Sequence, residues 1–198
     1  MDEKKLRKDI VNYALNEFIA KGIKSVKMDD IAKGVSMSKR TLYLIFPTKE
    51  SLLMCCIETA RKKQHEDLKN IDKESDGDVI KIIVGVLNMQ LRKFSRINPI
   101  FYEDIQKYPA IIKKLKSEDK NHEKRILAFF KRGVEQGVFQ KDLNYKIVVE
   151  HMRMQSQGFM MNKMYLRYKM VDIIKSMSMV ILRGLLTEKG LQIYKANS

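Results

Sequence analysis

The spacing of hydrophobic residues along the chain predicts a protein built from helices. Over residues 3–21, apolar residues recur every four positions, which is the repeat of one face of an α-helix. The other segments with a helical pattern are 49–70, 78–97, a short stretch from Asn98, 110–136 with one or two helices, 144–167 and 171–188. No segment shows the alternating pattern of a β-strand. The sequence therefore predicts an all-α fold with nine or ten helices.

Residues 27–49 predict two short helices separated by a tight turn, followed by the start of a third helix. Acidic residues stand at the N-terminal end of the first helix, which they favour. Gly34 and Ser36 mark the turn, and Ser38 is a good N-cap for the second helix. The apolar stripe of the second helix consists of Leu42, Ile45 and Phe46. This arrangement is typical of a DNA-binding helix-turn-helix.

The opposite face of the second helix carries side chains suited to contact with DNA. Its members are Lys39, Arg40, Thr41, Tyr43 and Leu44. Arg40 is the candidate for reading a guanine edge, because its guanidinium can donate two hydrogen bonds to O6 and N7. Thr41 suits a thymine methyl or a phosphate, and Lys27, at the start of the preceding helix, suits another phosphate.

At these residues the chain resembles the TetR family of bacterial one-component regulators. Members typically carry a stretch close to DIAKxxGVSKGTLYxYFxSKExL. The matching residues are Asp30, Ile31, Ala32, Lys33, Ser38, Lys39, Thr41, Leu42, Tyr43, Phe46, Lys49, Glu50 and Leu52. The chain departs from the pattern at the turn, where Ser36 and Met37 stand in place of the usual Gly and Val. Arg40 also stands where Gly is common, and Lys27 where a Ser or Thr often caps the helix.

The resemblance implies two domains with different functions. An N-terminal helix-turn-helix domain over residues 1–48 binds DNA, and a helical domain over residues 49–198 binds an effector and dimerises. Tyr43 and Lys49 match positions that contact phosphates in the family. The complete set of candidate DNA-binding residues is Lys27, Ser38, Lys39, Arg40, Thr41, Tyr43, Leu44 and Lys49. The resemblance also places a homodimer interface on the last two predicted helices, roughly residues 145–188.

Methionines and aromatic residues in the C-terminal part predict an apolar site. Eight methionines lie between residues 152 and 179, and methionine adapts its shape to irregular apolar pockets. The same spacing also fits a plain core or a subunit interface. The candidate residues for a pocket that binds a hydrophobic effector are Phe94, Phe101, Tyr102, Phe129, Phe130, Met152 and Phe159.

The composition agrees with a nucleic-acid partner but does not prove one. The net charge of +15 and the pI near 9.7 point to a polyanion, either nucleic acid or an anionic membrane surface. No uncharged apolar run of 18 residues predicts a transmembrane helix, and the N-terminus lacks the apolar core of a signal peptide. Cys55 and Cys56 are adjacent on a predicted helix and point to different sides, so we expect no structural disulfide between them. We expect a reduced, cytoplasmic protein with no membrane partner.

Three other functions are weighed against DNA-dependent regulation. For an enzyme, His65, His122 and His151 are widely spaced without a metal-binding motif, and no Gly-rich phosphate loop is present. The sequence thus predicts no catalytic residue, metal or cofactor. A membrane-surface protein needs a basic helix with exposed bulky apolar residues, whereas the apolar stripes here suit a core. The third alternative is a constitutive DNA-binding protein of the same fold. We predict a homodimeric, sequence-specific transcriptional regulator, a repressor released from double-stranded operator DNA by a small hydrophobic effector.

Overall fold

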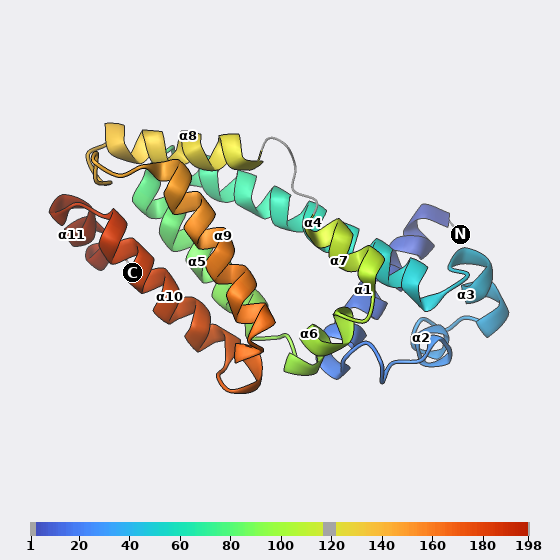
Figure 1. Ribbon diagram of the computed structural model, residues 1–198. Coiled ribbons are helices and arrows are strands. Elements are labelled where there is room, and N and C mark those ends of the chain that lie inside the picture. The colour runs from blue at the N-terminus through green and yellow to red at the C-terminus, as the bar shows by residue number, and fades with distance from the viewer. Residues whose placement is uncertain (1–2, 117–121, 198) are drawn as a thin grey trace. The chain divides into compact units, whose positions relative to one another are not determined.

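The computed structural model describes residues 3–116 and 122–197. Over these residues it contains eleven α-helices and one short 3-10 helix (Figure 1). The β-type pairing found among them is one isolated bridge, between Phe139 and Leu186. The predicted all-α fold is confirmed. No helix in the described part of the chain is long and apolar enough to cross a membrane.

The described residues gather into two compact units. Unit 1 contains residues 3–66 and 96–116, and unit 2 contains residues 67–95 and 122–197. This division follows packing and differs from the functional boundary predicted at residue 48. The helix α4 (Lys49–Glu74) begins in unit 1 and ends in unit 2.

Unit 1 is built on α1 (Glu3–Lys21), whose apolar stripe lies inward as its spacing predicts. Ile10, Ala14 and Phe18 are fully buried, one turn apart. The helix ends at Lys21, and Gly22 after it has a φ of +83°, the left-handed conformation common after helix C-termini. The two helices that follow are α2 (Met28–Gly34) and α3 (Lys39–Ile45). The first turns of α4 complete the core with Leu52, Leu53, Cys56 and Ile57.

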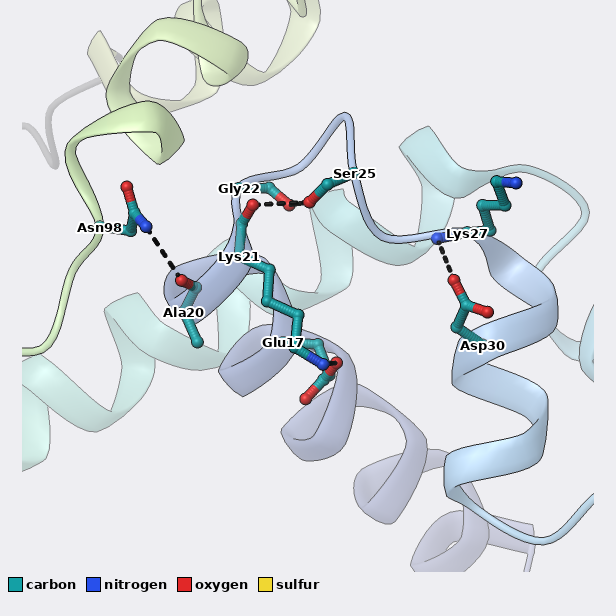
Figure 2. A network of polar contacts seen from close by, with 8 residues as sticks. All are labelled: Glu17, Ala20, Lys21, Gly22, Ser25, Lys27, Asp30 and Asn98. Carbon is teal, nitrogen blue, oxygen red and sulfur yellow. Dashed lines mark hydrogen bonds and ion pairs between the residues drawn. The ribbon is translucent and has the colours of Figure 1, made fainter.

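Two short helices from later in the chain also belong to unit 1, namely α6 (Pro99–Ile105) and α7 (Pro109–Lys116). Figure 2 shows how the start of α6 meets the end of α1. The Asn98 N–H donates to the Ile19 carbonyl at 2.9 Å, and the Asn98 side chain donates to the Ala20 carbonyl at 3.2 Å. Carbonyls in the last turn of a helix lack intrahelical donors. Asn98 therefore caps the C-terminal end of α1 as well as the N-terminal end of α6.

A buried carboxylate adds a second link between α6 and the α1–α2 connection. Asp104 accepts a hydrogen bond from the Lys24 N–H at 2.7 Å and pairs with the Lys107 ammonium at 3.1 Å. Burial by itself raises the pKa of Asp104, but the Lys24 N–H and the Lys107 charge outweigh burial, so the pKa lies below its usual value. Asp104 is thus ionised and fully engaged at neutral pH.

Unit 2 is a helical bundle around α5 (Val79–Phe94), which contacts α8 (His122–Glu135), α10 (Met170–Leu185) and α11 (Glu188–Asn197). The helix α9 (Tyr145–Met161) packs on α8 and on the 3-10 helix η1 (Met164–Leu166). The buried core of unit 2 is formed by Val79, Ile80, Phe130, Val138, Phe139, Leu182, Leu185, Leu186 and Tyr194.

The boundaries of two helices differ from the predicted ones. The fourth helix continues to Glu74, and the predicted helix over 144–167 ends at Met161, after which Lys163 has a φ of +48°. Part of the predicted segment 110–136, residues 117–121, lies outside the described residues.

The number of helices exceeds the predicted nine or ten chiefly because α11 was not predicted. Its sequence has a weak helical pattern, interrupted by Gly190. In the structure, Thr187 accepts a hydrogen bond from the Gly190 N–H at 3.1 Å, and Tyr194 is buried in the unit 2 core. The Thr187 cap was the local signal for this helix.

Candidate nucleic-acid interface

The helix α2 and the turn after it are held by local hydrogen bonds and by close packing on α1. The Lys27 N–H donates to the Asp30 carboxylate at 3.1 Å, which satisfies one N-terminal donor of α2 (Figure 2). At the other end, a Cβ at Gly34 would overlap the Tyr13 ring, so only glycine allows this approach. The turn then closes through Ser36, which has a φ of +54°. Serine adopts this left-handed conformation less readily than the glycine usual in the family.

The helix α3 begins and packs as the sequence predicts. Ser38 has an extended backbone, and its hydroxyl accepts a hydrogen bond from the Thr41 N–H at 3.0 Å. Leu42 is completely buried and Phe46, just after the helix, is 1% exposed. Ile45 is only half-buried. With Leu42 and Phe46 directed inward, the opposite face of α3 is left to solvent.

That outer face carries all five side chains predicted for it. Lys39, Arg40, Thr41, Tyr43 and Leu44 are exposed. Leu44 is 77% exposed although it is apolar, so its side chain is accessible to a partner such as a thymine methyl group. The face therefore combines a guanidinium, an ammonium, hydroxyl groups and an apolar tip within seven residues.

Lys39 connects the start of α3 to α2. Its ammonium lies 2.9 Å from the Asp29 carboxylate, and this hydrogen bond, together with the charge of Asp29, raises the pKa of Lys39. The same ammonium lies 5.9 Å from the centre of the Tyr43 ring. The described residues show no ion pair at Arg40. Arg40 is thus the cation of α3 whose guanidinium is held by no carboxylate of the described chain.

The structure places the two candidate lysines outside α3 differently. Lys27 is exposed at the start of α2. Lys49, at the start of α4, is half-buried and donates to the Lys24 carbonyl at 3.5 Å, and its ammonium lies 5.8 Å from the Phe18 ring centre. Burial lowers the pKa of Lys49, and the charge of Asp104 opposes that effect. A phosphate contact by Lys49 would require its ammonium to share or leave the Lys24 carbonyl.

The residues predicted to line an effector pocket fall into both units. Phe101 and Tyr102 are buried on α6 in unit 1, with ring centres 6.1 Å apart. Phe130 lies in the unit 2 core. Its ring stacks on that of Tyr145 with ring centres 4.7 Å apart, and its ring centre lies 5.5 Å from that of Phe139. The remaining members all belong to unit 2: Phe94 and Phe159 are half-buried, Phe129 packs beside Phe130, and Met152 is exposed. Sequence reasoning missed Phe139, which lies between α8 and α9, and Tyr145, which is the first residue of α9.

Two other kinds of site, a metal site and a reactive cysteine, find little support within the described residues. No three His, Cys, Asp or Glu side chains converge there as a metal site requires. Cys56 is fully buried, and burial raises the pKa of its thiol to about 12. A thiol in that environment is inert as a nucleophile.

A capped α2–turn–α3 pair on a small helical core, with cations on the outer face of α3, defines the helix-turn-helix class of proteins. Comparison with known proteins shows which family this part of the chain resembles. Residues 10–54 match the family "Bacterial regulatory proteins, tetR family". The resemblance to the tetR family that the sequence predicts is thereby confirmed over these residues, which contain most of α1, all of α2 and α3, and the start of α4.

An individual relative agrees with this match. The chain is 34% identical over 73 residues to the uncharacterized HTH-type transcriptional regulator YuxN of Bacillus subtilis (strain 168). That match covers 37% of the chain and 25% of the relative, so the chain spans about a quarter of the length of this curated relative.

Solved structures extend the likeness to both units. A transcriptional regulator from Cytophaga hutchinsonii superimposes with a TM-score of 0.71 at 19% identity, over 91% of this chain and 98% of that one. A putative transcriptional regulator from Saccharomonospora viridis in complex with choline gives a TM-score of 0.59 at 17% identity, over 94% of this chain and 100% of that one. At these identities the likeness establishes the fold.

Proposed function

We propose that this protein is a transcriptional regulator that binds double-stranded operator DNA as a homodimer and is released from it by a small hydrophobic effector, acting as a repressor. The observation that carries the proposal is the geometry of α3. It is a short helix, capped by Ser38 and anchored by the buried Leu42, and the five contact residues predicted on it are all exposed. Such a helix fits the major groove of B-DNA.

The contact residues divide by what they can read. Arg40 pairs with a guanine edge through two hydrogen bonds, and Thr41 and Leu44 contact thymine methyl groups or a neighbouring phosphate. Lys27, Tyr43 and Lys49 contact phosphates and set the register on the duplex. Ser38 orients α3 through its N-cap. Lys39 pairs with Asp29 and also contacts the DNA.

The dimer interface is proposed on α9 and α10. No residue of α9 is fully buried within the described chain. One face of α9 contains Ile147, Met154, Gly158 and Met161, whose spacing of seven, four and three residues aligns them. The three apolar side chains are 62% to 82% exposed, and on α10 Val180 is 63% exposed. Apolar surface of this kind marks an interaction site.

Gly158 and Gly184 support a second copy of this chain as the partner that covers α9 and α10. Four other helical glycines sit where a Cβ would crowd a neighbour of the same chain: Gly34, Gly85, Gly133 and Gly190. At Gly158 on α9 and Gly184 on α10 a Cβ would meet nothing within 4 Å. Glycine costs about 1 kcal/mol relative to alanine inside a helix, and nothing within the described chain offsets that cost here. A close helix of a partner does, and twofold pairing also supplies the second recognition helix that an operator needs.

The release step is proposed as a shift between two populated conformations. An effector bound between the helices of unit 2 favours the conformation in which α4, which begins just after α3, holds the two recognition helices at a spacing unsuited to successive major grooves. The choline complex of the Saccharomonospora protein supports a small-molecule site in this fold. A protein whose DNA affinity no compound alters would instead be a constitutive DNA-binding protein.

The decisive experiment measures sequence-dependent DNA binding by the full chain. Duplexes enriched from a random pool, and DNA from immediately upstream of the gene, are titrated by fluorescence anisotropy against scrambled duplexes at several salt concentrations. The proposal expects a preference of at least about a thousandfold for one duplex. Equal, steeply salt-dependent binding to all duplexes, or no enrichment from the pool, contradicts it.

The first mutational prediction separates base reading from phosphate contact. Arg40→Ala is expected to cost about 1–3 kcal/mol of binding free energy on the selected duplex and to relax specificity at one base pair. Lys49→Ala, the matched variant, is expected to weaken binding to all duplexes alike and to lower the salt slope by about one. Anisotropy titrations on single-base variants of the duplex measure both effects. Identical behaviour of the two variants would contradict the division of roles.

A further inference from the structure

Arg7, on α1, reaches the corner between the recognition helix and α4. Its guanidinium donates to the Ile45 carbonyl at 3.4 Å and to the Cys55 sulfur at 3.3 Å. The guanidinium carbon also lies 4.3 Å from the centre of the Phe46 ring, within the range of a cation–π contact. One side chain thus contacts the end of α3, the buried aromatic residue after it and the second turn of α4.

The end of α3 needs a contact from elsewhere in the protein. The helix has seven residues, and none in its last turn is basic. Its last carbonyls, including that of Ile45, have no intrahelical donor, and the C-terminal end of a helix favours a nearby cation. Arg7 supplies both the donor and the charge from a different helix.

The other end of α3 is already held. Ser38 caps it, and Lys39 joins it to Asp29 of α2. Leu42 is the only residue of α3 that is fully buried. A helix this short is not stable in isolation, and with one buried side chain its orientation depends on the contacts at its two ends.

We propose that Arg7 is a positioning residue for DNA recognition. It holds the C-terminal end of α3 against α1 and α4, so that Arg40 and Thr41 are presented to the major groove in one orientation. This inference rests on the proposed function, since it assigns α3 the role of recognition helix. Arg7 itself contacts no base and no phosphate in this assignment.

The test compares Arg7→Gln and Arg7→Lys with Lys8→Gln, which removes the same charge from an exposed position one residue further along α1. Titrations use the full chain with the selected and scrambled duplexes. Arg7→Gln is expected to lower affinity for the selected duplex on the order of tenfold, with unchanged affinity for the scrambled duplex and an unchanged salt slope. Arg7→Lys keeps the charge over Phe46 but loses the forked donor, so an intermediate loss is expected.

The thiol of Cys55 reports on the same corner without DNA. Cys55 is half-buried beside Arg7, whereas Cys56 is fully buried with its pKa raised to about 12, so alkylation near pH 8 follows Cys55. Arg7→Gln is expected to accelerate this labelling several-fold. Lys8→Gln is expected to leave it unchanged.

Each other outcome overturns the inference in a distinguishable way. A salt slope lowered by about one, with equal losses on both duplexes, would make Arg7 a phosphate contact. Unchanged labelling and unchanged affinity in Arg7→Gln would show that these contacts do not hold α3. If the wild-type protein selects no duplex, the proposed function fails, while the labelling rates still decide whether Arg7 holds the corner.

Discussion

Replacing Asp104 by alanine is expected to destabilise the protein by about 2–4 kcal/mol. The side chain of Asp104 is 4% exposed and accepts from the Lys24 N–H, so its removal leaves a partly buried backbone donor without its acceptor and takes away the partner of Lys107. Urea unfolding at pH 7 measures the loss. Because the Lys24 N–H lies in the connection that leads into α2, operator affinity is expected to fall as well.

Two variants separate the contributions at this site. Asp104→Asn keeps an acceptor for the Lys24 N–H but loses the charge, so it should cost less than alanine. Lys107→Gln removes an ammonium whose side chain is 61% exposed, and such an exposed pairing contributes less than about 1 kcal/mol. A loss in Lys107→Gln as large as that in Asp104→Ala would show that the ion pair, rather than the buried hydrogen bond, stabilises the link.

The stability conferred by the Asp104 charge should depend on pH in a defined direction. Since the folded pKa of Asp104 lies below its usual value, the contribution of the charge is complete above the unfolded pKa, near 4. It is lost as the pH falls from there through the folded pKa. The stability difference between wild type and Asp104→Asn should therefore be constant from pH 7 to about 5 and shrink below about pH 4. A difference that grows on acidification would contradict this assignment.

Replacing Gly158 by leucine is expected to dissociate the proposed dimer while leaving the monomer intact. Within the described chain, a Cβ at Gly158 meets nothing within 4 Å, and leucine favours a helix over glycine by nearly 1 kcal/mol. At a close helix–helix interface, overpacking costs about 1–3 kcal/mol per site, and the symmetry of a dimer doubles it. The dimer dissociation constant should thus rise by roughly 30-fold or more, with loss of operator binding at nanomolar protein.

Analytical ultracentrifugation and urea unfolding together test this prediction. Ala110→Leu, at an exposed position of α7 in unit 1, adds comparable bulk away from the proposed interface and should leave the dimer unchanged. An undisturbed dimer in Gly158→Leu would place the interface elsewhere. A destabilised monomer would mean that Gly158 has a role within its own chain.

The helix-turn-helix was predictable because its signals are local. The four-residue repeat of α1, the Ser38 cap and the inward position of Leu42 each follow from neighbours in sequence, and the structure has all three. Ser36 is the instructive exception. The family pattern places glycine at this turn, yet serine takes the left-handed conformation here, because hydrogen bonds such as that from the Met37 N–H to the Ala32 carbonyl, at 2.9 Å, close the turn regardless.

The C-terminal part was less predictable because its patterns are ambiguous. Aromatic residues at helical spacing fit a pocket or a core equally well, and the structure places Phe130 in a core while Met152 is exposed. The chain also returns to unit 1 through α6 and α7, far from the helix-turn-helix in sequence. Periodicity reports which face of a helix is apolar but does not report which partner covers it.

The sequence by itself determined the helical class of this protein, the place of the helix-turn-helix and the outer face of α3. These features depend on backbone propensity, capping and the period of apolar residues, all of which act over a few residues. The tertiary structure alone decided that Asp104 holds the α1–α2 connection, that Arg7 reaches the end of α3, that Lys49 donates to the Lys24 carbonyl, and that Gly158 and Gly184 face open space. Each of these features either joins groups that are distant in the chain or depends on what surrounds a residue in space. Their energies come from burial and from the pairing of polar groups, which exist only once the chain has folded.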